Sequence, residues 1–180
     1  MPYAGNILLI GLRGSGKSTL GPRLADRLGF TFTDLDDLVA RAMGEETAGA
    51  AFAKHGQAAF RQMEGKMLVD VVRPARQVIA LGGGTPTGMV ALEAIKREQA
   101  AGRAKVFYLR AEPATLRDRL RKTDISSRPS LTGADPLDEI DAVFSRRDPL
   151  YCGLADETII VDDSEEDAVL EELARAAAGQ

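Results

Sequence analysis

The sequence predicts an α/β fold with a mostly parallel sheet, and two observations favour this class. Five short apolar runs recur along the 180 residues, separated by longer stretches with helical spacing. Such alternation is typical of α/β proteins. Runs such as NILLI and QVIAL are also apolar at successive positions, as expected for strands that helices cover on both faces.

The predicted strands and helices follow one another along the chain. Strands are predicted for the apolar runs at residues 6–10, 30–33, 78–81, 106–109 and 158–161. The stretches between these runs repeat apolar residues at helical spacing. They predict helices at 17–28, 36–43, 47–71 with an interruption near Gly56, 87–99, 112–122, 136–152 and 164–178.

The composition indicates one soluble domain. With 44% hydrophobic residues, the chain can bury a core without metals or disulfides. Its single cysteine, Cys152, cannot form an internal bridge, and no apolar run approaches the roughly 20 residues that a membrane-spanning helix needs. No secretory signal precedes the first predicted strand. We therefore expect a cytoplasmic protein with one domain over residues 1–180.

The net charge of −4 is unevenly placed. Residues 96–128 contain ten Lys or Arg against four Asp or Glu, whereas residues 156–180 contain nine acids and one Arg. A local basic stretch in an acidic protein favours a small anionic ligand over nucleic acid, which usually needs a broad basic face. Ordinary charged helix surfaces give the same pattern, so charge alone leaves both interpretations open.

Residues 11–18 (GLRGSGKS) match the phosphate-binding motif G-x-x-x-x-G-K-[ST]. They follow a predicted strand and precede a predicted helix, which is the context that this motif requires. Its glycines let backbone N–H groups approach phosphate oxygens, while the positive end of the helix faces the same anion. Lys17 can reach the outer phosphates, and Ser18 can bind Mg²⁺. The motif therefore predicts a nucleoside triphosphate site.

Two carboxylates, Asp34 and Asp36, end the second apolar run. If the strand continues to residue 36, both side chains point the same way, because side chains alternate with a period of two. A carboxylate near Mg²⁺ and another that orients a hydroxyl would suit phosphoryl transfer to an alcohol. The alternative is that one of them caps the helix that follows.

Four further motifs come later in the chain: FRQME at 60–64, LGGGTP at 81–86, SSRPSL at 126–131 and RRDPLY at 146–151. Arg61 and Glu64 are three residues apart on a predicted helix, where an ion pair is an ordinary outcome. The three glycines directly after a predicted strand leave room for a ligand to touch the backbone. Residues 122–135 are polar and rich in turn formers, which predicts a mobile surface loop or a plain connector.

In their order and spacing, GLRGSGKST, DLD at 34–36 and these four motifs resemble shikimate kinase over roughly residues 5–163. The resemblance implies transfer of the γ-phosphoryl group of ATP to the 3-hydroxyl of shikimate, with Mg²⁺. It implies a three-layer α/β/α fold with a five-stranded parallel sheet of order 2-3-1-4-5, substrate-binding helices over about 36–71 and a mobile lid over about 122–135. It also implies a monomer without nucleic-acid or membrane partners, active in aromatic amino acid biosynthesis.

The resemblance assigns the nucleotide side to the phosphate loop and two arginines. One arginine lies near the adenine and the other, in the lid, reaches the transferring phosphate. Ser18 and Asp34 are implied to hold the metal. The implied nucleotide-binding residues are Gly14, Ser15, Gly16, Lys17, Ser18, Thr19, Arg121 and Arg128.

The resemblance assigns the acceptor side to one carboxylate, two arginines and the glycine run. Asp36, with Lys17 and Arg128, is implied to be catalytic and to take the proton or orient the hydroxyl. Two planar guanidinium groups make a suitable pocket for a carboxylate. Arg147 is preferred over Arg146 because one residue separates the family arginine from Pro-Leu-Tyr, and here that residue is Asp148. The implied acceptor residues are Asp36, Arg61, Gly82, Gly83, Gly84 and Arg147.

The chain departs from the family pattern in two segments. GEETAGAAFAKHG at 44–56 replaces a bulkier apolar segment and predicts a wider acceptor pocket, with Phe52 and Phe60 as apolar walls. Acids at 161–167 stand where some relatives carry an arginine, which leaves the nucleotide preference open.

His55 is expected to be a surface residue and Tyr108 a core residue. Two rival functions remain, a gluconate-type kinase and a ligand-sensing domain without activity.

Overall fold

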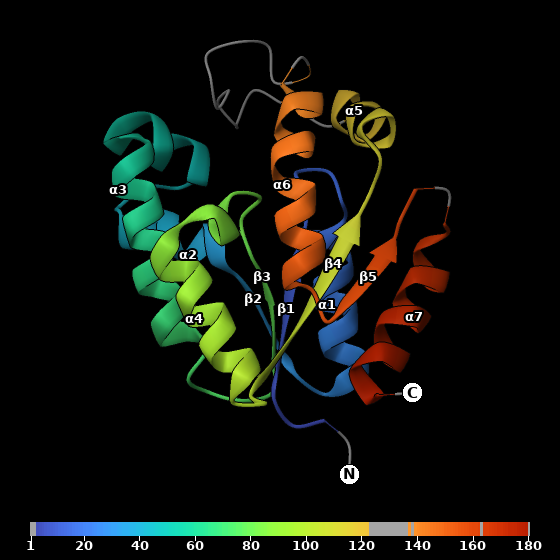
Figure 1. Cartoon of the computed structure of the whole chain (residues 1–180). Coiled ribbons are helices and arrows are strands. Elements are labelled where there is room, and N and C mark those ends of the chain that lie inside the picture. The colour runs from blue at the N-terminus through green and yellow to red at the C-terminus, as the bar shows by residue number, and fades with distance from the viewer. Residues whose placement is uncertain (1–2, 123–136, 138, 163, 180) are drawn as a thin grey trace.

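A five-stranded parallel sheet forms the centre of the computed structural model, which describes residues 3–122, 137, 139–162 and 164–179 (Figure 1). The strand order is β2-β3-β1-β4-β5, so the predicted order 2-3-1-4-5 is confirmed. Each neighbouring pair of strands runs parallel. The strands are β1 (Asn6–Ile10), β2 (Thr31–Asp34), β3 (Gln77–Ala80), β4 (Ala104–Arg110) and β5 (Glu157–Ile160).

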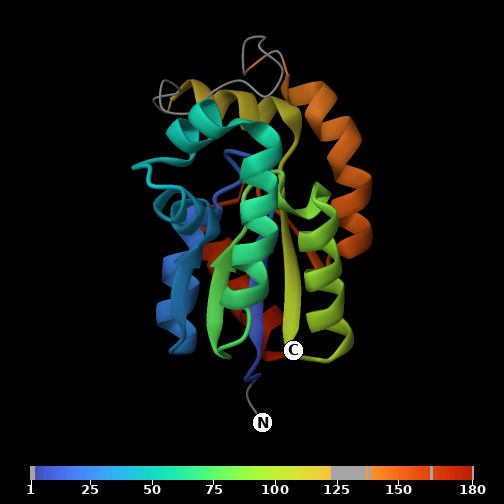
Figure 2. The same cartoon turned by 90° about the vertical axis from the view of Figure 1, so that its left-hand side faces the viewer.

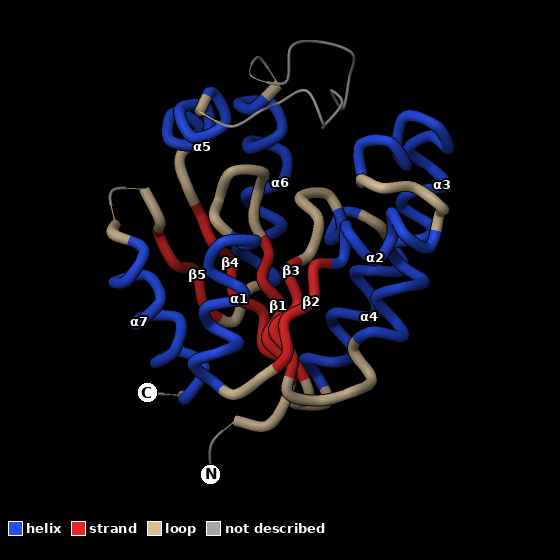
Figure 3. The backbone as a smooth tube through the Cα atoms, turned by 180° about the vertical axis from the view of Figure 1, so that it is seen from behind, coloured by secondary structure: helices blue, strands red, loops and turns tan. Residues whose placement is uncertain are grey.

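Helices cover both faces of the sheet, which gives the three-layer architecture that the sequence predicts. In the described residues, α1 and α7 pack on one face (Figure 3), and α3, α4 and α6 lie on the other (Figure 1). The helices are α1 (Lys17–Leu28), α2 (Leu35–Ala42), α3 (Ala48–Val71), α4 (Met89–Ala100), α5 (Pro113–Arg121), α6 (Ile140–Leu154) and α7 (Glu166–Ala178), with a 3-10 turn η1 (Thr85–Thr87) after β3.

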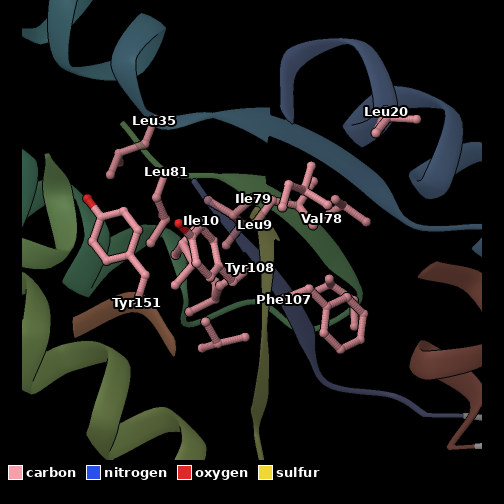
Figure 4. Packing of buried hydrophobic residues seen from close by; sticks show 14 of the residues in the cluster. Leu9, Ile10, Leu20, Leu35, Val78, Ile79, Leu81, Phe107, Tyr108 and Tyr151 are labelled. Atoms are coloured by element: carbon pink, nitrogen blue, oxygen red, sulfur yellow. The ribbon is translucent and has the colours of Figure 1, made fainter. Parts of the chain in front are cut away.

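The core lies against the central strand β1, whose five residues are all buried. Apolar residues at every position of β1 explain this, because both faces of the strand are covered. Tyr108 of β4 and Tyr151 of α6 are fully buried and meet edge to face, with ring centroids 5.4 Å apart (Figure 4). Tyr108 is therefore a core residue, as expected. The contact ties α6 to the sheet.

Every predicted strand and helix overlaps an observed one, the predicted interruption at Gly56 is confirmed, and one boundary matters for the site. The second strand ends at Asp34, and α2 begins at Leu35. The interruption in α3 lies at Gly56, which has φ 82° and ψ 164°, and the helix bends near its N-terminal end (Figure 2). Of the loop predicted at 122–135, all but Lys122 lies outside the described residues. No helix in the described part of the chain is long and apolar enough to span a membrane.

Parallel pairing brings the carboxyl ends of β1, β2 and β3 to one edge of the sheet. The phosphate loop follows β1, Asp34 ends β2 and the glycine run follows β3. In open α/β sheets, ligands bind at this edge, where the strand order reverses. The topology thus gathers three motifs that are far apart in the sequence.

Candidate active site

A cavity of about 680 Å³ opens at the carboxyl edge of the sheet. This volume suits a cofactor or small-molecule site. Residues of the phosphate loop, β2, α2, α3, the glycine run, α5 and α6 line it. Among the predicted site residues, the lining includes Gly14, Ser15, Gly16, Lys17, Ser18, Thr19, Asp34, Asp36, Arg61, Gly82, Gly83, Gly84 and Arg147.

The phosphate loop wraps around the start of α1. Gly14 and Gly16 adopt φ values of 84° and 98°, a left-handed conformation that side chains disfavour. Lys17 folds back over the loop, and its Nζ donates to the carbonyls of Gly11 at 2.7 Å and Leu12 at 3.0 Å. Amide groups at the helix start and the Lys17 ammonium group thus lie at the same end of the cavity, an arrangement that binds phosphate.

Asp34 uses both of its carboxylate oxygens. Oδ1 accepts from the backbone N–H of Asp36 at 3.0 Å and so caps α2, which confirms the capping alternative for Asp34. Oδ2 accepts from the hydroxyl of Ser18 at 2.9 Å. A hydroxyl and a carboxylate side by side are hard oxygen donors of the kind that Mg²⁺ prefers, so these residues fit the metal.

Asp36 lies in the first turn of α2, not on an extended strand. The prediction that Asp34 and Asp36 point the same way on one extended strand is therefore wrong, because a helix begins at Leu35. Both side chains nevertheless line the cavity. Burial raises the pKa of the Asp36 carboxyl to about 6, and the negative charges of Glu64 and Asp34 add to the rise.

Arg61 and Glu64 form the ion pair that their spacing predicts, and Arg61 of this pair lines the cavity. The Glu64 side chain is almost completely buried and holds the guanidinium group of Arg61 through Oε2. Its Oε1 accepts from the hydroxyl of Thr85 at 2.5 Å. No local pattern in the sequence indicates Thr85, because 21 residues separate it from Glu64.

The glycine run allows two side chains to approach the backbone. A Cβ on Gly82 would overlap the carboxylate of Asp36, and one on Gly84 would overlap the guanidinium group of Arg61. The carbonyl of Gly83 accepts from Arg147 at 2.5 Å and from the hydroxyl of Tyr151 at 2.6 Å. Burial lowers the pKa of Arg147, and the nearby positive charge of Arg61 acts in the same direction.

The two arginines predicted to share one anion do lie together. Arg61 reaches Gly84, Arg147 reaches Gly83, and both line the same cavity. Arg146 is exposed and donates to the carbonyl of Ala142 in its own helix at 3.2 Å, so only Arg147 of this pair faces the site.

Apolar side chains line the part of the cavity that contains Arg61. The rings of Phe52 and Phe60 meet edge to face with centroids 5.8 Å apart, on either side of the interruption at Gly56. Both rings line the cavity. His55 lies beside this segment and pairs with Glu45 at 3.2 Å, which fits the expected surface role.

The structure describes one of the two arginines that the sequence predicts for nucleotide binding. Arg121 is exposed, pairs with Asp118 at 3.3 Å and does not line the cavity. Arg119 does line it, and donates to the carbonyls of Gly14 at 3.4 Å and Asp162 at 3.3 Å. Its position three residues after the buried Leu116 is a helical signal that could have identified it. Arg128 lies outside the described residues.

Comparisons with known proteins agree on one family. The family model described as "Shikimate kinase" matches residues 13–178. The chain is 40% identical over 157 residues to "Shikimate kinase" of Symbiobacterium thermophilum, covering 87% of each protein. It is 38% identical over 174 residues to "Shikimate kinase" of Rhodopirellula baltica, covering 96% of this chain and 90% of that one. A solved shikimate kinase from Acinetobacter baumannii in complex with shikimate superposes with a TM-score of 0.84 at 30% identity, covering 96% of this chain and 92% of that chain.

Proposed function

Because this chain belongs to the shikimate kinase family, we propose that it transfers the γ-phosphoryl group of ATP to the 3-hydroxyl of shikimate. One observation carries this proposal. Arg61 and Arg147 converge on the glycine run at one part of a cavity whose other end is the phosphate loop. A cyclic acid held by both guanidinium groups would have its hydroxyls beside Asp36.

On the nucleotide side, the phosphate loop binds the triphosphate through its amides, and Lys17 neutralises charge on the outer phosphates. Ser18 and Asp34 would hold Mg²⁺, which supplies further charge neutralisation at the transferring group. We assign the contact with the base to the face of α5 that carries Leu116 and Arg119, in place of Arg121. Arg128 is proposed to reach the transferring phosphate.

On the acceptor side, Arg61 and Arg147 grip the carboxylate of the substrate, and the backbone of Gly83 approaches its ring. Two planar guanidinium groups bind a carboxylate with defined orientation, which fixes which hydroxyl faces the nucleotide. Asp36 accepts a hydrogen bond from that hydroxyl and takes its proton as the phosphoryl group arrives. Its raised pKa of about 6 makes it a better base than an ordinary aspartate at neutral pH.

We further propose that the protein is cytoplasmic and acts as a monomer without nucleic-acid or membrane partners, on the route to the aromatic amino acids. The acidic net charge of −4 supports the absence of nucleic acid as a partner. Residues 1–180 are proposed to act as one domain, with a lid over about 122–135 and substrate-binding helices over about 36–71.

A coupled assay of ADP release tests the proposed function. With ATP and Mg²⁺, we expect rapid turnover with shikimate and slow turnover with gluconate or nucleoside monophosphates. A faster rate with gluconate would replace the acceptor assignment with the gluconate-type alternative. Shikimate-dependent stabilisation without any ADP release would favour the sensing domain. The Lys17→Ala variant is the control for the phosphate loop and should lose most of the turnover, about 100-fold or more.

A further inference from the structure

Glu64 is a buried carboxylate whose two oxygens serve different partners. Its side chain has a relative exposure of 1%, and Oε2 holds the guanidinium group of Arg61. Oε1 accepts from the hydroxyl of Thr85 at 2.5 Å. A buried carboxylate needs hydrogen bonds to stay in place, and removing a donor from one leaves a costly unsatisfied charge. Thr85 supplies such a bond from outside the helix that carries the ion pair.

The position of Thr85 is fixed by its backbone as well as by burial. Thr85 is completely buried and begins the 3-10 turn η1, in which Pro86 follows. Its N–H donates to the carbonyl of Gly82 at 3.0 Å, which anchors the turn to the glycine run. The residue therefore presents its hydroxyl to Glu64 from a rigid support.

The same small space also contains the carboxylate of Asp36. A Cβ placed on Gly82 would overlap Asp36 Oδ1 and would lie 2.7 Å from Glu64 Oε1 and 2.9 Å from Thr85 Oγ1. One carboxylate oxygen of Asp36 and one of Glu64 thus lie close to the same position beside Gly82, where their negative charges repel each other. Because Thr85 donates to the Glu64 oxygen on this side, it offsets the repulsion that would otherwise turn Glu64 away from Asp36 and from Arg61.

We propose that Thr85 is a positioning residue for substrate binding. Its hydroxyl fixes Glu64 so that the opposite oxygen holds Arg61 toward the cavity. The substrate carboxylate then meets a guanidinium group already in place, which lowers the ordering cost of binding. This inference rests on the proposed function, since it takes Arg61 to bind the acceptor's carboxylate.

Kinetics of three variants test the inference. Thr85→Val removes the hydroxyl and keeps the shape, so the shikimate KM should rise about tenfold, as for one lost hydrogen bond to a charged group, with kcat little changed. Thr85→Ser keeps a donor and should restore the wild-type KM. Thr87→Val is the matched control, because Thr87 lies in the same turn but donates to the carbonyl of Gly84 at 2.6 Å instead of to Glu64. An unchanged KM in Thr85→Val, or an equal rise in Thr87→Val, would overturn the proposal.

A second measurement does not depend on turnover. In ¹⁵N NMR spectra of the arginine side chains, Arg61 of the wild-type protein should show slow guanidinium rotation, which Thr85→Val should accelerate and Thr85→Ser should not. If Thr85→Val fails to fold, Thr85→Ala removes the same donor and replaces it in both experiments. Inactivity of the wild-type protein toward shikimate would contradict the proposed function, whereas unchanged Arg61 dynamics would contradict the role of Thr85.

Discussion

At the scale of single residues, the proposed acceptor site depends on glycines, because a side chain at two of these positions would overlap its charged groups. Gly82 and Gly84 are both buried, and a side chain on either would occupy the space of a carboxylate or a guanidinium group. Gly83 contributes its carbonyl, which accepts from Arg147 and Tyr151. Each of the three glycines therefore has a separate function, which the repeated letter in the sequence does not show.

The Gly84→Ala variant should raise the shikimate KM by at least about tenfold, because the new methyl group displaces Arg61 from its position. Steady-state kinetics measure this effect. Gly153→Ala is the matched control: Gly153 lies in α6 with no neighbour near its added methyl group. That substitution should leave the kinetics unchanged and stabilise the fold by about 0.5–1 kcal/mol, as measured by urea unfolding. Equal KM values for the two variants would contradict the role of Gly84.

The ionisation of Asp36 should govern both activity and stability. In the proposed mechanism the Asp36 carboxylate takes the proton, so kcat should fall as the pH is lowered through about 6, and Asp36→Asn should lose about 100-fold or more in kcat. Folding raises this pKa from 3.8 to about 6. The favourable contribution of Asp36 to the free energy of unfolding is therefore complete below pH 3.8 and is lost as the pH rises through 6.

Denaturant unfolding at several pH values measures the stability effect of Asp36. The Asp36→Asn variant carries no charge at this position. Its free energy of unfolding should therefore exceed that of the wild-type protein by about 2 kcal/mol at neutral pH, with a smaller difference at pH 4. A variant less stable than the wild-type protein at neutral pH would show that the carboxylate is not destabilised by its buried position.

At the scale of elements, α3 lines the cavity from both sides of Gly56. The part before the bend carries Phe52, and the part after it carries Phe60 and Arg61. The backbone of Gly56 has φ 82° and ψ 164°, a region that is essentially restricted to glycine. This bend allows one continuous segment to line two sides of the cavity.

We expect Gly56→Ala to destabilise the fold by about 1–3 kcal/mol, because alanine is strained in this conformation. Hydrogen exchange should rise mainly in residues 48–55, and the shikimate KM should increase as the Phe52 wall loosens. The exposed Gly153 provides the control again, since an alanine there adds no strain. Unchanged exchange in 48–55 would mean that the segment can accept a continuous helix.

The sequence predicted the elements well because their signals are local. Apolar runs and helical spacing located all five strands, and the phosphate loop was recognised from its motif and its flanking elements. The position of Asp36 required knowledge of where β2 ends, which depends on the capping bond from Asp34. The bond between Thr85 and Glu64 depends on packing between separate elements, so no pattern along the chain predicted it. Arg119 was missed although its helical spacing from Leu116 indicates its position.

At the scale of the whole molecule, the parallel sheet assembles the site from segments far apart in the chain. The phosphate loop, the end of β2 and the glycine run meet only because three strands end at one edge (Figure 1). A ligand that bridges these segments binds the folded protein alone and therefore stabilises all of it. Binding and global stability are thus linked.

Shikimate at about 100 times its dissociation constant should stabilise the fold by about 2.7 kcal/mol and raise the melting temperature by a few degrees. Calorimetry or a thermal shift assay measures this change. Arg147→Ala should remove most of the shift, because it deletes one of the two guanidinium groups. Arg146→Ala should keep it, because that side chain points away from the cavity. A similar loss in both variants would indicate a general effect of charge.

The double acceptance by the Gly83 carbonyl bears on the design of inhibitors. When Arg147 turns from this carbonyl to an incoming ligand, the Tyr151 hydroxyl still satisfies the oxygen, so the arginine is released without leaving a buried group unpaired. This change is favourable only if the hydrogen bond from Arg147 to the ligand is at least as strong as the one that Arg147 loses to the Gly83 carbonyl. An anionic ligand makes a stronger bond to arginine than an amide or an ester does. Compounds that mask the acid to cross membranes should therefore bind poorly until the mask is removed.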